Sequence, residues 1–238
     1  MDNNFDRCLA FVLKEEGGND DDPNDHGGRT SRGITQREWD KFRLTNPDRP
    51  VDVWKAPDND IRTIYHASYW LPHCSNLPSG LDLCFFDFGV NAGQHQAIKT
   101  LQKCLGIPSD GGWGPQTESL VSSIKDVASA INAYSVGREG FYKGLAQYPR
   151  YGRGWTSRNE ACRKEALSMV GVTVPSPQAN PVDVKKNKTA GPATVIVGTA
   201  ATTAAASQYH SPLIFLGVIA AVLVVGIVVH YLINRKVN

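Results

Sequence analysis

The feature that most constrains this chain is an apolar helical pattern near the N-terminus that ends in a glutamate and two glycines. The apolar residues recur at helical spacing; they are Phe5, Cys8, Leu9, Val12 and Leu13. Glu16 continues this stripe, whereas its neighbour Glu15 is expected to face solvent. Gly17 and Gly18 should end the helix. A carboxyl group at the end of an apolar face is partly desolvated, which disfavours its charged form. Glu16 is therefore the first candidate for a general acid.

A long loop rich in glycine and aspartate, residues 17–34, follows this helix and holds the second candidate, Asp25. Pro23 prevents a helix across the loop, and loops of this length inside a compact domain usually carry function. Two carboxyl groups are the minimal equipment for glycoside hydrolysis, because one protonates the leaving oxygen while the other activates water or supports the developing cation. The alternative is that Glu16 is an ordinary helix-end residue and that the aspartates are solvated.

The same aspartates leave a calcium site open as another alternative. Asp20, Asp22 and Asn24 have the spacing of the first three ligands of an EF-hand loop. That loop requires glycine at its sixth position and glutamate at its twelfth, where this chain has Asp25 and Ser31. The pattern is incomplete, and we predict neither a metal ion nor an organic cofactor.

Six motifs, in order along the chain, resemble the lysozymes of glycoside hydrolase family 108, which are N-acetylmuramidases of bacteria and phages. The motifs are Glu16-Gly17-Gly18, Asp25-x-Gly27-Gly28-x-Thr30-x-x-Gly33-Ile34-Thr35, Tyr69-Trp70, Phe86-Asp87-Phe88-x-Val90-Asn91-x-Gly93, Asp110-Gly111-x-x-Gly114-Pro115-x-Thr117 and Arg153-Gly154-Trp155-x-x-Arg158. They cover most of residues 1–171. The resemblance implies a mainly α, lysozyme-like catalytic domain over 1–171, whose second half, about 93–171, is similar to peptidoglycan-binding helical modules.

The resemblance also implies roles for particular residues. The family's catalytic glutamate directly precedes the Gly-Gly pair, which makes it Glu16 here. Asp25 and Thr30 look like the aspartate and threonine of the phage lysozyme active site, although Thr30 lies one residue nearer to the aspartate than in that pattern. By this resemblance Asp25 holds or activates water, or stabilises positive charge, and Thr30 assists it.

Two further segments are expected to shape the glycan groove. A helix that begins after Asn59 should deliver Tyr69 and Trp70. A strongly apolar central helix, residues 81–91, carries Asp87 and Asn91 four residues apart and hence on one face. A polar pair on so apolar a helix must find partners or line a cleft. The resemblance favours the cleft, and a structural hydrogen-bonded pair is the alternative.

Helical periodicity and capping signals predict the remaining elements. A small hairpin is expected around residues 27–33, and Thr35 and Glu38 form a capping box for the next helix. Further helices are expected over about 94–105, from Pro115, over 126–147 and over 155–170. Residues 148–154 should form a loop whose aromatic and arginine side chains contact glycan or fix the loop. Trp113 either stacks on sugar or anchors its turn.

The charge of residues 1–171 excludes a nucleic-acid-binding domain. Of the 25 basic and 23 acidic residues, five basic residues and one acidic residue lie beyond residue 171. Residues 1–171 therefore carry a net charge of −2, whereas a domain that binds nucleic acid is clearly basic. The five cysteines form no CxxC pair and fit neither a zinc site nor a disulfide framework. We expect reduced thiols that pack as small apolar side chains.

The composition changes after residue 171. Residues 172–211 are rich in Pro, Ala and Thr, which is typical of a linker. Leu213 to Ile233 spans 21 residues without Asp, Glu, Lys or Arg, which matches the hydrocarbon core of a bilayer. We therefore predict a transmembrane helix over 212–234 and a single-pass protein of a bacterial or infected host's inner membrane. Its topology stays open: Arg235 and Lys236 favour a cytoplasmic C-terminus, whereas an N-terminus without a signal-peptide pattern favours a cytoplasmic enzyme.

Together these features predict a membrane-tethered lysozyme. It would cleave the β-1,4 bond between N-acetylmuramic acid and N-acetylglucosamine in peptidoglycan, in cell lysis or in wall remodelling. Two alternatives remain open: a lytic transglycosylase, which needs only the acid/base glutamate, and a membrane-anchored peptidoglycan-binding protein without activity. Retention or inversion depends on the separation of the two carboxyl groups, which the sequence does not give.

Overall fold

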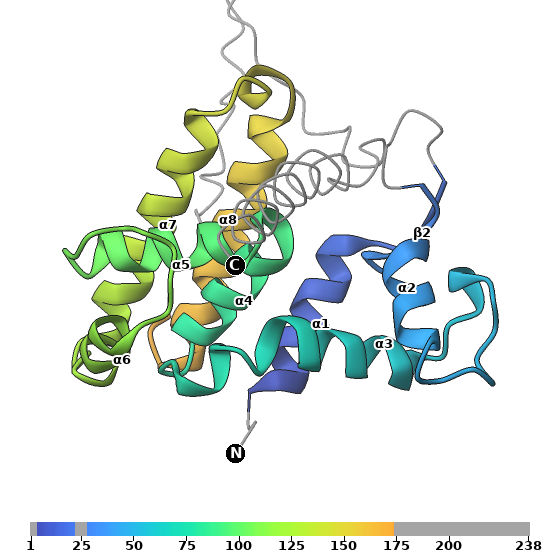
Figure 1. The fold of residues 1–238 in the computed structure, drawn as a ribbon. Helices are drawn as coiled ribbons and strands as arrows, with labels where there is room; N and C mark the ends of the chain where they lie inside the picture. Colours follow the sequence, from blue (N-terminus) through green and yellow to red (C-terminus); the bar gives the residue numbers. More distant parts are fainter. Residues whose placement is uncertain (1–3, 22–27, 174–238) are drawn as a thin grey trace, which may run out of the picture. The chain divides into compact units, whose positions relative to one another are not determined.

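The computed structural model describes residues 4–21 and 28–173, all of which belong to one compact unit. Over these residues the fold is mainly helical, as expected, with eight α-helices and one small three-stranded sheet (Figure 1). Residues 4–70 hold the small sheet, the first three helices and the described residues of the first candidate site, and residues 81–169 form the larger helical part. The two parts meet at α4 (Leu81–Ala92).

Helix α1 (Phe5–Glu16) buries the predicted apolar stripe almost unchanged. Its buried residues are Phe5, Cys8, Leu9, Val12 and Glu16, while Leu13 is partly exposed. Gly17 ends the helix with a φ of +77°, a backbone conformation that residues other than glycine rarely adopt. Glu15 does not face solvent as fully as expected, because its side chain is half-buried.

The small sheet lies directly after α1. Its strands β1 (Asn19–Asp20), β2 (Thr30–Ser31) and β3 (Ile34–Thr35) pair antiparallel in that order. Strands β2 and β3 form the predicted hairpin, and its two turn residues, Arg32 and Gly33, both have positive φ. Positive φ at both central positions is the geometry of a type I′ turn, which matches the twist of the paired strands.

Helix α2 (Gln36–Arg43) begins with the predicted capping box. The amide of Glu38 donates to the Thr35 hydroxyl, and the Glu38 carboxylate accepts from the Thr35 amide. After a 3-10 turn (Val53–Lys55), α3 (Asp58–Tyr65) continues into a π-helical turn (His66–Trp70) that contains Tyr69 and Trp70. Such turns are rare, and they occur frequently at functional sites.

Helix α4 is the centre of the domain, and all its residues are buried. It packs against α1 on one side and, on the other, against three helices: α5 (Gln94–Cys104), α7 (Val127–Lys143) and α8 (Tyr148–Met169). Figure 1 shows α4 between these two groups. Phe85, Phe86 and Phe88 are completely buried, and each such side chain stabilises the fold by about 1.5–3 kcal/mol. Helix α6 (Pro115–Ser122) begins at Pro115, as predicted.

The prediction of a loop over residues 148–154 is wrong, because α8 already begins at Tyr148. Pro149 lies in the first turn, where its missing N–H costs no hydrogen bond. Gly152 is required inside the helix because a side chain there would overlap the ring of Tyr148. Proline and two glycines therefore suggested a loop in the sequence, whereas each of them is compatible with a helix in its actual surroundings.

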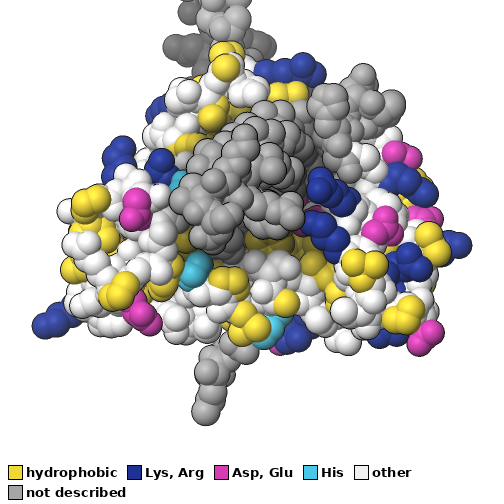
Figure 2. Space-filling model, in the orientation of Figure 1, with side chains coloured by type: hydrophobic (Ala, Val, Ile, Leu, Met, Phe, Trp, Pro, Cys, Tyr) yellow, Lys and Arg dark blue, Asp and Glu magenta, His cyan; other side chains and the backbone are white. Residues whose placement is uncertain are grey.

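The C-terminal predictions fall mostly on residues whose structure is not described. The linker (172–211), apart from its first two residues, and the transmembrane helix (212–234) lie outside the described residues. Among residues 4–21 and 28–173, no helix combines the length and apolar character needed to span a bilayer. On the face drawn in Figure 2, acidic and basic side chains of the described part are interspersed with apolar ones.

Candidate active site

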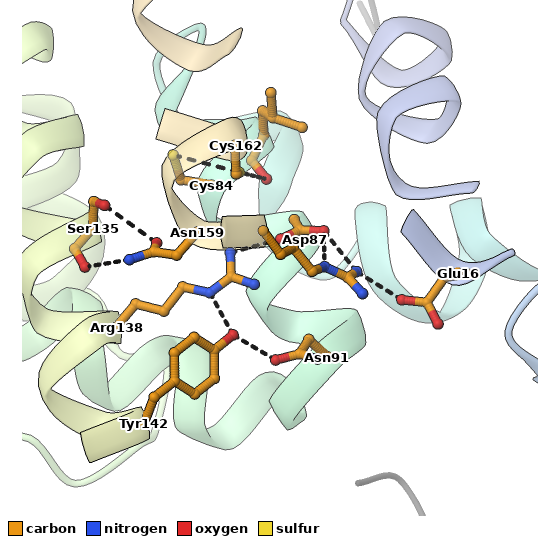
Figure 3. Close-up of polar contacts among 11 residues, drawn as sticks. Glu16, Cys84, Asp87, Asn91, Ser135, Arg138, Tyr142, Asn159 and Cys162 are labelled. Carbon is orange, nitrogen blue, oxygen red and sulfur yellow. Dashed lines mark hydrogen bonds and ion pairs between the residues drawn. The ribbon is translucent and has the colours of Figure 1, made fainter. Parts of the chain in front are cut away.

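Glu16, the first candidate for the general acid, lies at the end of α1 with only 3% of its surface exposed. Its Oε1 accepts a hydrogen bond from Nη2 of Arg158, at a distance of 2.7 Å. Arg158 lies on α8 and is buried too. The candidate acid is therefore held by a residue from the last helix of the domain (Figure 3).

Arg158 is shared between Glu16 and a second buried carboxylate, that of Asp87 on α4. Nε and Nη2 of Arg158 both donate to Oδ1 of Asp87, at 3.0 and 2.7 Å. The other oxygen, Oδ2, lies 2.6 Å from Nη1 of Arg138 on α7. Glu16, Arg158, Asp87 and Arg138 thus form a continuous row of alternating charges, which we call the charge array (Figure 3).

The charge array is buried, and its charged groups shift one another's pKa values. Burial alone raises the pKa of Asp87, but the guanidinium groups of Arg158 and Arg138 outweigh it and hold this pKa below its ordinary value. Burial likewise favours the neutral form of Arg158, yet Asp87 and Glu16 outweigh it, so the pKa of Arg158 is raised and the side chain stays charged. Two positive groups therefore face two carboxyl groups in a region that water does not reach.

The far end of the charge array is fixed by Tyr142 and Asn91. Nε of Arg138 donates to the Tyr142 hydroxyl at 2.7 Å, and this hydroxyl donates to Oδ1 of Asn91 at 2.6 Å. The guanidinium carbon of Arg138 also lies 4.9 Å from the ring centre of Phe88, close enough for a cation–π interaction. Arg138 is therefore held from both α4 and α7.

The β2–β3 turn packs directly on Glu16. A methyl group at Gly33 would lie 3.1 Å from Cγ of Glu16 and would overlap the Tyr65 hydroxyl. This hydroxyl donates to the backbone oxygen of Arg32 at 2.8 Å. Burial, and then the nearby Glu16 carboxylate, raise the pKa of Tyr65, so its hydroxyl keeps its proton. The glycine of this motif is required both by its positive φ and by its closeness to the candidate acid.

Of the other two predicted catalytic residues, one is described and one is not. Thr30 lies on β2 and is buried, and its hydroxyl has no hydrogen-bond partner within the described part of the chain. Its backbone oxygen accepts from the indole of Trp54 at 2.9 Å. Asp25 lies outside the described residues. The catalytic roles of both stay predictions.

The two residues of the π-helical turn differ in their surroundings. Tyr69 is partly exposed, and its hydroxyl donates to Oε1 of Glu38 at 3.3 Å. Trp70 is buried, and its ring lies 5.3 Å from that of Phe5 and 5.5 Å from that of Phe86. Tyr69 thus keeps some exposure to solvent, whereas Trp70 supports the turn from the core.

Asp87 and Asn91 lie on one face of α4, as predicted, but this face does not line an open cleft. Asp87 is completely buried and Asn91 nearly so. Their side chains are engaged by Arg158, Arg138 and Tyr142. The structure therefore favours the alternative of a hydrogen-bonded structural pair over direct contact with glycan.

No role was expected for Arg138, and Arg158 was expected only as the last residue of the Arg153-Gly154-Trp155-x-x-Arg158 motif. A signal for Arg138 was present, because it follows Tyr134 and precedes Tyr142 at intervals of four residues on the buried face of α7. A charged residue on a buried helical face requires a partner of opposite charge. Glu15 was expected to face solvent, whereas it is half-buried and burial raises the pKa of its carboxyl group.

Trp113 and the cysteines occupy structural positions. The ring of Trp113 stacks on that of His73, with centres 4.4 Å apart, which favours the turn-anchor alternative. All five cysteines are free, and Sγ of Cys84 and Sγ of Cys162 lie 3.9 Å apart in the core. Among the described residues, no three His, Cys, Asp or Glu side chains are grouped to hold a metal ion.

Comparisons with known proteins identify the family of the chain. The family described as Glycosyl hydrolase 108 matches residues 9–93, which include Glu16 and Asp87 but neither arginine of the charge array. A solved structure entitled "Structure of Brucella abortus SagA" is similar, with 30% sequence identity and a TM-score of 0.61; the match covers 71% of this chain and 97% of that one. No curated protein matches the chain. The helical fold, the glutamate before two glycines and these matches lead to one conclusion: the chain belongs to the glycosyl hydrolase 108 family and is a lysozyme-like peptidoglycan hydrolase by that membership.

Proposed function

We propose that this protein is an N-acetylmuramidase that cleaves the β-1,4 bond between N-acetylmuramic acid and N-acetylglucosamine in peptidoglycan. The observation that carries the proposal is the position of Glu16. A single carboxyl group is buried at the end of α1, beside the β2–β3 turn, and is held by a buried arginine. A fixed carboxyl group with little access to water is what protonation of a glycosidic oxygen requires.

In this proposal Glu16 is the general acid that protonates the leaving oxygen. Asp25, from the loop between β1 and β2, holds or activates the attacking water or supports the positive charge that develops on the sugar. Thr30 assists Asp25, and its hydroxyl, which is buried and without a partner among the described residues, is free to take that role. These residues need no metal or organic cofactor for the reaction.

The glycan strand would lie over the π-helical turn. Tyr69 is partly exposed there and would contact sugar directly. Trp70, Asp87 and Asn91 are buried and would shape the groove from beneath, by fixing the turn and α4. All four residues thus belong to the substrate region, but only Tyr69 would touch the glycan.

We further propose that residues 212–234 anchor the enzyme in the inner membrane, from which it acts on the cell wall. The uncharged stretch from Leu213 to Ile233 supports this anchor. A role in lysis or in wall remodelling would follow from the side of the membrane on which the enzyme lies.

The test is the chemistry of the ends that the protein produces. Purified peptidoglycan is digested with the full chain, and the fragments are reduced with borohydride and separated by mass, with Glu16→Gln as the blank. Reduced muramic acid ends, released by wild type only, are the expected result. Anhydro-muramic ends would indicate a transglycosylase, reduced glucosamine ends would indicate cleavage of the other bond, and no release by wild type would contradict the proposal.

A further inference from the structure

We propose that Asp87 and Arg138 are positioning residues for Glu16: they hold Arg158 in one place, and Arg158 in turn holds the carboxyl group of Glu16 for proton transfer. This inference rests on the proposed function, since it gives the buried charge array a task in that reaction. It assigns to Asp87 a role through other side chains, without contact with glycan.

The geometry of Arg158 is the first argument. Its Nη2 lies 2.7 Å from Oε1 of Glu16 and 2.7 Å from Oδ1 of Asp87. Because one nitrogen serves both carboxylates, any shift of Asp87 moves the donor that holds Glu16. The second bond from Nε to Asp87 fixes the plane of the guanidinium group.

Charge balance is the second argument. The side chains of Glu16, Arg158, Asp87 and Arg138 are 3%, 3%, 0% and 1% exposed, so water cannot replace a missing partner. Asp87 lies between the two guanidinium groups, and it is the carboxylate that remains when Glu16 carries the proton it is to transfer. Neutralising Asp87 leaves two buried guanidinium groups without a carboxylate between them, and repulsion between them would displace Arg158.

The third argument is the rigidity of the far end. Arg138 is fixed by the Tyr142 hydroxyl, which is itself fixed by Asn91. The charge array is thus attached to α4 and α7 at one end and reaches the end of α1 at the other. A row of fixed groups behind a reacting side chain reduces the range of positions that the side chain adopts, and small misplacements of a catalytic group are costly to rate.

The experiment compares kinetic constants of full-chain variants on soluble peptidoglycan glycan chains. Asp87→Asn is expected to lower kcat by about 10–100-fold, while KM changes little because Asp87 is buried. The double variant Asp87→Asn with Arg138→Met removes one charge of each sign and is expected to recover much of the lost kcat. Glu165→Gln, which removes an exposed carboxylate from the same helix as Arg158, serves as the control and should leave both constants unchanged.

A variant that removes no charge, Tyr142→Phe, separates loss of positioning from loss of folding. Tyr142→Phe removes only the hydroxyl that fixes Arg138 and should lower kcat several-fold with KM unchanged and with a wild-type circular dichroism spectrum. If the ion pair had only a structural role, the double variant would recover the amount of folded protein but not kcat per folded molecule. Recovery of kcat per folded molecule therefore indicates a positioning role.

Several results would overturn the inference. A rise in KM with kcat unchanged in Asp87→Asn would make Asp87 a glycan contact. A double variant no faster than the single one, or a folded Tyr142→Phe with wild-type kcat, would remove the positioning role and leave the proposed function intact. A wild type that releases no ends would instead overturn the proposed function, and this inference with it.

Discussion

Helices α1 and α8 are joined by two ion pairs of equal length in opposite surroundings. At the start of α1, Arg7 lies 2.7 Å from Glu165, and the two side chains are 49% and 37% exposed. At the end of α1, Glu16 lies 2.7 Å from Arg158, and both side chains are 3% exposed. The distance is the same, but the effective dielectric constant and the access of water differ.

Burial, and not distance, decides what an ion pair does in this protein. The exposed pair is screened by water and salt, and it is one contact among several, since Arg7 also donates to Ser168. The buried pair belongs to a charge array whose members have no water to replace a lost partner. The first pair is expected to contribute little to stability or activity, and the second is expected to be essential to both.

The largest expected effect is on stability. Replacing Arg158 by methionine should lower the free energy of unfolding by about 3–5 kcal/mol, because it leaves the buried charges of Glu16 and Asp87 with too little positive charge. Arg7→Met, the matched change in the exposed pair, should cost no more than about 1 kcal/mol. Urea unfolding followed by tryptophan fluorescence measures both free energies. Equal losses in the two variants would contradict the claim that burial makes the Glu16–Arg158 pair the more important one.

A smaller effect is expected at the turn beside Glu16. Gly33 and Gly17 both have positive φ, so alanine at either position should cost about 1–3 kcal/mol through backbone strain. A methyl group at Gly33 also meets Tyr65 and Glu16, whereas nothing lies within 4 Å of one at Gly17. Gly33→Ala should therefore lose more stability and most of the lytic rate. If thermal unfolding and lysis assays found the two variants alike, the close packing on Glu16 would have no consequence.

The loss of stability at acid pH is expected to differ between a buried and an exposed carboxylate, Asp87 and Glu160. The pKa of Asp87 is lower in the folded state than its ordinary value of 3.8, so its stabilising effect is present at neutral pH and is lost as the pH falls through the folded-state pKa. The wild type should lose stability below about pH 4, and Asp87→Asn should show a shallower loss. Hydrogen bonding from Arg163 lowers the pKa of Glu160 on the surface of α8. In 1 M salt, where the screening length is roughly 3 Å, Glu160→Gln should change the loss of stability at acid pH little. An equal change in Asp87→Asn and Glu160→Gln would argue against a special role of burial.

The smallest expected effect concerns Glu15. Burial raises its pKa, so the contribution of this group to the stability of the protein is present below its unfolded-state pKa and is lost as the pH rises through its higher folded-state pKa. Glu15→Gln should therefore stabilise the protein at pH 7, by less than about 1 kcal/mol because the half-exposed group is screened. Differential scanning calorimetry at pH 4 and pH 7 measures this, and a loss of stability at pH 7 would contradict it.

Much of the fold follows from local sequence patterns, because helical periodicity and caps act over a few residues. The apolar stripe of α1, the capping box at Thr35 and Pro115 at the start of α6 are all in place. The early start of α8 could not be predicted in this way. Gly152 and Pro149 favour loops in isolation, and only their surroundings, the first helical turn for Pro149 and the ring of Tyr148 beside Gly152, explain why the helix includes them.

In the candidate site, too, local features could be predicted from the sequence and contacts between distant residues could not. Glu16 could be identified from its position at the end of an apolar stripe, which is a local property. The partners of Glu16 and Asp87 could not, because Arg158 lies 142 residues after Glu16 and 71 residues after Asp87 in the chain. Periodicity places Asp87 on a buried face of α4, but it does not tell whether a ligand or an arginine fills the space beside it.

The catalytic role of Glu16 is tested most directly by the lytic rates of two neighbouring variants. Glu16→Gln and Glu15→Gln each replace one carboxyl group by an amide, one residue apart on α1, and both should leave the helix intact. We expect Glu16→Gln to release reducing ends from peptidoglycan about 10²–10⁴-fold more slowly than wild type, as loss of a general acid does. Glu15→Gln should retain nearly the wild-type rate. A Glu16→Gln variant that keeps full activity would contradict the assignment of Glu16 as the general acid, and with it the mechanism proposed for this protein.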